Sequence, residues 1–157
     1  MKYKLTENII LGDRLIKNGS VLSVEELPSF VVYDPYLNSE AEYISLDNIK
    51  VGHKFFQLDI DSQKHVLLHE IGHHFSDKLL KNGVAFDWQD NGLFIGDFNN
   101  SKVDGINGQY KPGENVAEAF AVFIDEPEFL KKHYIALYKE LENTLDITYY
   151  KRWIDAI

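Results

Sequence analysis

The chain has 157 residues, a length that fits one domain with its own hydrophobic core. Apolar residues make up 45% and charged residues 26%, which is ordinary for a globular protein and does not indicate disorder. The net charge of −9 repels phosphate backbones, so we expect no nucleic-acid partner. Cysteine is absent, so a bound transition metal must use histidine or carboxylate ligands.

The N-terminal residues contain no apolar run long enough for a signal peptide, and no segment is long enough to span a bilayer. The sequence therefore predicts a cytoplasmic protein. The alternative is a secreted mature form whose leader is absent. Nothing in the residues indicates an oligomeric state.

Residues 1–60 are predicted to be rich in strands. Three runs have the β-branched or aromatic residues typical of strands: 7–12 (ENIILG), 29–34 (SFVVYD) and 53–60 (HKFFQLDI). Two segments are typical of turns: 17–20 (KNGS) and 34–38 (DPYLN).

Residues 61–157 are predicted to be mainly helical. Helical spacing of apolar residues and histidines predicts a first helix over 62–82, with Asp61 or Ser62 as N-cap and Gly83 as its stop. Residues 84–111 are rich in Gly, Asn and Asp, which predicts a long loop with a short strand at 92–96 (GLFIG).

Three more helical segments are predicted after this loop. Pro112 precedes a second helix, GENVAEAFAVFIDE, which Pro127 ends. A third helix is predicted over 128–145. The last residues, 147–157 (ITYYKRWIDAI), are predicted to form a further helical turn.

The first predicted helix contains His69, Glu70 and His73 in the pattern His-Glu-x-x-His. Histidines four residues apart share one helix face and can bind one ion, whereas Glu70 can reach a water held by that ion. Zinc with three protein ligands keeps a position for water and lowers its pKa to about 7. Glu70 would accept the proton of that water and pass it to a leaving amine. The apolar residues around the motif favour this interpretation over two solvent-facing histidines.

A third ligand is required, and the other histidines fit poorly. His65 lies one turn before His69 but too far along the helix to converge with His73, so we expect it to face solvent or line a cleft. His74 is interpreted as an ordinary polar neighbour, and nothing around His53 or His133 indicates a site.

Glu114 and Glu118 are better candidates, because residues four apart share one face of the second helix. One can bind zinc, and the other can accept a hydrogen bond from a ligating histidine and so fix its tautomer. The alternative is a solvated acidic helix start favoured by the helix dipole, which explains Glu114 better than Glu118.

The two motifs together, His69-Glu70-x-x-His73 and Glu114-x-x-x-Glu118, resemble those of the gluzincin metallopeptidases. The stretch GENVAE is similar to the Gly-Glu-Asn-apolar-Ala-Asp stretch of the neprilysin and thermolysin relatives, in which the first acid binds zinc and the second orients a histidine. The resemblance therefore implies that Glu114 is the third ligand and that Glu118 supports a histidine.

Within the gluzincins, HEIGHH and ENVAEAF are most similar to the group of the anthrax lethal factor catalytic domain and the Pro-Pro endopeptidases. The gap from His73 to Glu114 also fits that group. One departure concerns the tyrosine that stabilises the oxyanion about two turns before the ligand glutamate, because Asn107 occupies this position here. Tyr110 is the candidate donor in its place, and an ordinary surface tyrosine is the alternative.

A second family competes with this interpretation. ENVAEAFAVFIDEP is also similar to the Glu-x-x-Ala-Asn-x-Phe-Ala run, ending in Pro, of the ImmA/IrrE-type peptidases. Those proteins are cytoplasmic and cleave repressors of phages and mobile elements. Glu118 in place of their Asn and the longer gap between the motifs count against them, whereas the absence of a signal peptide favours them.

The sequence thus predicts an α+β, zincin-like metallopeptidase domain spanning residues 1–157. A small N-terminal β-sheet is expected to pack on the motif helix and to hold an extended peptide along its edge strand. The predicted activity is hydrolysis of peptide bonds with one zinc ion as cofactor and a peptide or protein as substrate. The rival is a non-catalytic interaction protein with a structural zinc, which would need neither Glu70 nor an open coordination position.

Overall fold

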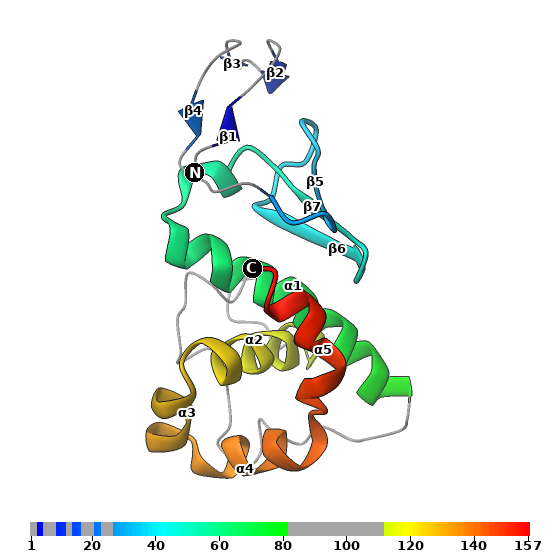
Figure 1. Cartoon of the computed structure of the whole chain (residues 1–157), viewed down its shortest axis with the longest axis vertical. Helices are drawn as coiled ribbons and strands as arrows, with labels where there is room; N and C mark the ends of the chain where they lie inside the picture. Colours follow the sequence, from blue (N-terminus) through cyan, green and yellow to red (C-terminus); the bar gives the residue numbers. More distant parts are fainter. Residues whose placement is uncertain (1–2, 5–8, 12–13, 17–20, 23–26, 82–111) are drawn as a thin grey trace. The chain divides into compact units, whose positions relative to one another are not determined.

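Figure 1 shows the computed structural model of the chain, which describes residues 3–4, 9–11, 14–16, 21–22, 27–81 and 112–157. The fold is α+β, with a small three-stranded sheet and mostly helical content, as the sequence predicted at this level. The chain forms two compact units, Met1–Leu67 with Ala156–Ile157 (the N-terminal unit) and Leu68–Asp155 (the helical unit). Three expectations stay predictions: that the chain is a single domain, that the sheet packs on the motif helix, and that a peptide binds along the edge strand of the sheet.

Two short antiparallel strand pairs begin the N-terminal unit. β1 (Tyr3–Lys4) pairs with β4 (Val21–Leu22), and β2 (Ile9–Leu11) pairs with β3 (Arg14–Ile16). The strand predicted within 7–12 is therefore confirmed as β2, whereas the turn predicted at 17–20 lies outside the described residues.

The larger sheet has the strand order β5-β7-β6. Its central strand β7 (Asn48–Val51) runs parallel to β5 (Val31–Tyr33) and antiparallel to β6 (Ala41–Ser45). Ile49 and Val51 are fully buried, as expected for alternate residues of a central strand. β5 confirms the strand predicted within 29–34.

The turn predicted at 34–38 is confirmed, and the strand predicted at 53–60 is wrong. Asp34 accepts a hydrogen bond from the backbone N–H of Tyr36 at 2.9 Å. Phe55–Gln57 forms a short 3₁₀ helix (η1) instead of a strand. Its two aromatic rings are buried against each other, with ring centroids 5.5 Å apart, so the aromatic pair fills a buried turn and not two faces of a strand.

α1 (Ile60–Lys81) is the motif helix and begins two residues before the predicted start. The side chain of Asp59 accepts a hydrogen bond from the N–H of Ser62 at 2.8 Å, so Asp59 caps the helix and the predicted caps Asp61 and Ser62 are wrong. Because this cap fits the first turn, the helix starts at Ile60. The predicted stop at Gly83 and the strand at 92–96 lie outside the described residues.

α2 (Pro112–Asp125) begins one residue before the predicted start and ends before Pro127, as predicted. The single helix predicted over 128–145 is wrong, because α3 (Pro127–His133) and α4 (Ile135–Thr144) are separated at Tyr134, whose φ of −141° is not helical. The break lets α4 return toward α2, where the rings of Phe123 and Tyr138 lie 5.3 Å apart. A tertiary contact therefore overrides the continuous helical pattern.

α5 (Ile147–Ile154) confirms the predicted closing helical segment. Its Tyr150 is buried and packs against Phe75 of α1 and Phe120 of α2, at centroid distances of 6.4 and 5.2 Å. This aromatic cluster holds three helices of the helical unit together. Within the described part of the chain, no helix is long and apolar enough to cross a bilayer.

Candidate metal centre

The His-Glu-x-x-His motif lies in the middle of α1, within the helical unit. His69 and Glu70 are buried and His73 is partly exposed. Each of the three offers one ring nitrogen or carboxylate oxygen, and these three atoms lie within 4.8 Å of one another. The cluster is thus dense enough to hold a metal ion.

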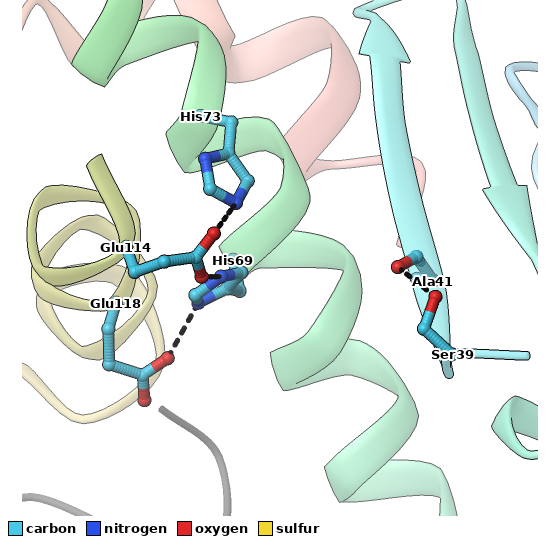
Figure 2. A network of polar contacts seen from close by, with 6 residues as sticks. All are labelled: Ser39, Ala41, His69, His73, Glu114 and Glu118. Atoms are coloured by element: carbon cyan, nitrogen blue, oxygen red, sulfur yellow. Dashed lines mark hydrogen bonds and ion pairs between the residues drawn. The ribbon is translucent and has the colours of Figure 1, made fainter. Parts of the chain in front are cut away.

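α2 brings Glu114 to both histidines. One carboxylate oxygen of Glu114 lies 2.9 Å from Nε2 of His69, and the other lies 3.2 Å from Nε2 of His73. Figure 2 shows this carboxylate turned toward the two rings, with one oxygen directed to each. The same nitrogen of both rings therefore converges on a single carboxylate from another helix.

Glu118 contacts the other side of His69. Its carboxylate accepts a hydrogen bond from Nδ1 of His69 at 2.8 Å, and its side chain is 1% exposed (Figure 2). Because a carboxylate can only accept, this contact places a proton on Nδ1 and orients Nε2 toward Glu114. The buried glutamate thus keeps a proton on Nδ1 and fixes the direction of the ring.

These contacts shift the pKa values of two groups strongly. Burial lowers the pKa of His69, but its hydrogen bonds to Glu114 and Glu118 and the charges of Glu118 and Glu70 outweigh burial and raise the pKa from 6.5 to about 10. Burial raises the pKa of Glu114, but hydrogen bonds to His69 and His73 outweigh it and hold the pKa well below its usual range. The site therefore concentrates acidic groups around two imidazoles, an arrangement that also suits a cation.

The donor set fits a zinc ion. Zinc prefers imidazole nitrogen and carboxylate oxygen when no thiolate is present, at about 2.0–2.2 Å in a tetrahedral arrangement. Such bond lengths place neighbouring ligand atoms roughly 3.3 Å apart. The distances of 2.9 and 3.2 Å from Glu114 to the two Nε2 atoms lie close to that spacing.

One side of the centre is open to solvent. The side chains of His73 and Glu114 are 20% and 27% exposed, whereas those of His69 and Glu118 are 9% and 1% exposed. A small molecule can thus approach from the side of His73 and Glu114, while Glu118 and His69 form the closed side.

The remaining candidates lie elsewhere or outside the described residues. His65 is buried, so its predicted exposure to solvent is wrong, and the alternative that it lines a cleft stays a prediction. His74 shares a hydrogen bond with the hydroxyl of Tyr150 at 2.9 Å and thereby links α1 to α5. The proposed oxyanion donor Tyr110, and Asn107, lie outside the described residues.

Three residues next to the centre escaped the sequence analysis. Gly72 lies where the backbone of α2 comes close to α1, and the buried polar residues Ser76 and Asn115 flank the motifs. A glycine in the middle of a helical pattern is a signal for close packing. For Ser76 and Asn115 the sequence carries no such signal, because their burial depends on the partner helix.

Comparisons with protein-family models, with curated proteins and with solved structures find no match to this chain.

Proposed function

We propose that the protein is a zinc-dependent metallopeptidase of the gluzincin type, which hydrolyses peptide bonds in a peptide or protein substrate. The observation that carries the proposal is the convergence of Nε2 of His69, Nε2 of His73 and the carboxylate of Glu114, with Nδ1 of His69 held by Glu118. Metal-binding histidines typically donate their second ring N–H to a carboxylate in this way.

Two carboxylates compete for the third ligand position. Glu70 lies on α1 beside His69, whereas Glu114 reaches the Nε2 atoms of both histidines from α2. We assign the position to Glu114, because it already lies at ligand spacing from both nitrogens. This assignment leaves Glu70, whose carboxylate is within 4.8 Å of the histidine ring nitrogens, for proton transfer.

When bound, zinc supplies Lewis-acid chemistry that polarises a carbonyl and acidifies water. His69, His73 and Glu114 would hold the ion. Nε2 of His69 gives up its proton when the ion binds, whereas Glu118 retains the proton on Nδ1. Glu70 accepts a proton from the attacking water and delivers it to the leaving amine. Its buried position favours this role, since burial limits access of competing water.

The test is Glu70→Gln, with Glu128→Gln on the exposed surface of α3 as the matched control. We expect Glu70→Gln to retain one zinc ion per chain and to lower the cleavage rate of a peptide library by about 100–10,000-fold, the usual contribution of a general base. Glu128→Gln should cleave at the wild-type rate. Zinc content is measured by elemental analysis, and cleavage by mass spectrometry of the library.

A second variant, Glu114→Ala, tests the ligand assignment. We expect it to lose stoichiometric zinc, because only two nitrogen ligands remain. Retention of a full equivalent of zinc would show that the third ligand lies elsewhere. If the wild type and Glu70→Gln both bind zinc and neither cleaves a peptide, the alternative of a non-catalytic zinc-containing interaction protein is supported instead.

A further inference from the structure

We propose that Gly72 is a positioning residue that sets the spacing between α1 and α2, and with it the reach of Glu114 and Glu118 to the two histidines. The proposal concerns residues of this chain, and its bearing on metal binding rests on the proposed function. Gly72 has no side chain and so supplies no ligand atom itself.

The distances at Gly72 leave no room for a side chain. A Cβ at this position would lie 2.5 Å from the carbonyl oxygen and 2.8 Å from the Cα of Ala117, both backbone atoms of α2. It would also lie 3.0 Å from Cβ of Phe120. Ordinary van der Waals contact begins at 3.4 Å, so the α2 backbone would have to move.

A second contact shows that this spacing continues along the helices. Ser76 lies one turn after Gly72, and its Oγ would be 3.6 Å from a Cβ at Gly113, one turn before Ala117. Gly72 and Ser76 of α1 therefore face Ala117 and Gly113 of α2, respectively. The residue numbers rise along α1 as they fall along α2. Small residues at four-residue spacing let helix backbones approach closely.

The ligands follow the same register as the small residues. Glu114 and Glu118 each follow one of the small residues of α2 directly, and His73 follows Gly72. The contacts His73–Glu114 and His69–Glu118 also run in opposite directions along the two helices, at 3.2 and 2.8 Å. The backbone approach at Gly72 and the side-chain contacts of the centre are thus set by one interface.

An alanine at position 72 should therefore open the centre. Restoring ordinary contact requires the Ala117 carbonyl to move by roughly 1 Å. Ligand distances in metal sites are expected within about 0.2 Å of their standard values. A movement of the α2 backbone by roughly 1 Å is several times larger than this range. Glu114 and Glu118 would then have to rearrange to reach the ion, which should lower the affinity for zinc.

The experiment compares Gly72→Ala with Gly113→Ala, a matched control at which a Cβ meets only ordinary contact. Zinc affinity is measured by competition with a chelator, and ligand geometry by the visible spectrum of the cobalt-substituted protein. We expect Gly72→Ala to lower zinc affinity by about 10–100-fold, as loss of a supporting group does, and to change the cobalt spectrum. Gly113→Ala should leave both close to wild type.

Leu137→Ala serves as the control for a general loss of stability, because it removes a buried side chain from α4, away from the centre. It should lower the melting temperature while the folded protein binds zinc with wild-type affinity. Should Gly72→Ala fail to fold, Ser76→Leu adds bulk at the second contact and is expected to weaken zinc binding in the same way. Wild-type affinity and an unchanged cobalt spectrum in a folded Gly72→Ala or Ser76→Leu would overturn the proposal.

A metal-free readout distinguishes failure of this proposal from failure of the proposed function. The hydrogen bond from Nδ1 of His69 to buried Glu118 should give a slowly exchanging imidazole N–H signal in the NMR spectrum of the metal-free protein. We expect Gly72→Ala to lose or shift this signal and Gly113→Ala to keep it. If the wild type takes up no zinc, the proposed function fails. The positioning proposal is then decided by this signal alone, and it fails if Gly72→Ala leaves the signal unchanged.

Discussion

The two helix pairs of the helical unit bury different kinds of side chain. α3 and α4 bury Leu130, Leu137 and Leu141 completely, and none of their polar side chains is buried. α1 and α2, in contrast, bury several polar groups within the helical unit: His69, Glu70, Ser76, Asn115 and Glu118. One pair thus packs as an apolar core, and the other encloses ionisable groups.

This difference shows that the interface between α1 and α2 departs from what packing alone would require. Burial of a charged group is unfavourable unless it is paired, and a paired buried charge is seldom better than apolar packing. The pairing of His69 with Glu114 and Glu118 offsets the burial, yet leucines would fill the same space with less difficulty. Buried, strongly perturbed ionisable groups of this kind cluster at functional sites.

The largest expected effect on stability belongs to the apolar pair. Leu137→Ala should lower the free energy of unfolding by about 2–5 kcal/mol, because it removes buried methyl groups and leaves a cavity. Zinc affinity of the folded protein should not change, since Leu137 lies on α4, outside the centre. Denaturant unfolding measures the first quantity and chelator competition the second. A joint loss of both would show that the two helix pairs are not separable.

The next largest effect is expected when Glu118 is replaced, and the quantity that should change is the affinity for zinc. Glu118→Ala removes the acceptor of the Nδ1–H of His69, and we expect zinc affinity to fall by about 10–100-fold. Glu118→Gln keeps an acceptor oxygen of nearly the same size, so its loss should be smaller. Chelator competition on the two variants checks the order. Equal affinities of Glu118→Ala and wild type would remove Glu118 from the support of the centre.

The ionisable groups of the α1–α2 pair should make the stability of the metal-free protein depend on pH. The pKa of His69 is raised to about 10, so its pairing stabilises the metal-free protein fully below pH 6.5, and this stability is lost as the pH rises toward 10. The pKa of Glu114 is lowered, so its contribution is lost as the pH falls below the usual value of 4.5. We therefore expect the melting temperature of the metal-free protein to be highest between these limits, near pH 5–6.

Zinc should reverse the alkaline part of this profile. Because zinc competes with the proton on His69, the rise in melting temperature on adding zinc should grow as the pH increases from 6 to 8. Calorimetry with and without zinc at each pH provides the measurement. A zinc effect independent of pH would indicate that no proton is displaced, and that the ion binds away from His69.

The sequence could predict those parts of the centre that depend on local spacing. His69, Glu70 and His73 lie within one helix, so their shared location follows from helical periodicity. Pro112 and the four-residue spacing likewise predicted the second helix and a common face for its two glutamates. Their roles came from the resemblance to gluzincins, and the structure places them at 2.8–3.2 Å from the histidines.

Other features depend on contacts between distant segments and could not be predicted in this way. The helical pattern continues through Tyr134, but the helix breaks there, and Tyr138 of α4 packs against Phe123 of α2. The paired Phe55 and Phe56 have high strand propensity, yet they form a buried turn because both rings pack inward. The close approach at Gly72 likewise becomes visible only when α2 lies against it.

The smallest expected effect concerns a polar group of the α1–α2 pair that has no assigned role. Ser76 is 1% exposed, and its hydroxyl has no hydrogen-bond partner among the residues that the structure describes. Removing a buried, unpaired hydroxyl is neutral or favourable, and alanine forms helix better than serine. Ser76→Ala should therefore raise the melting temperature by about 2–4 °C, which corresponds to about 1 kcal/mol in a chain of this size.

Calorimetry on the metal-free protein tests this expectation, and zinc affinity should stay unchanged because Ser76 holds no ligand. A fall in melting temperature of similar size would mean that the hydroxyl is paired in solution with a group beyond the described residues. Ser76 would then belong to the polar part of the interface, together with His69 and Glu118. The difference between the two helix pairs would then be larger, because each buried polar side chain of α1 that was tested would have a hydrogen-bond partner.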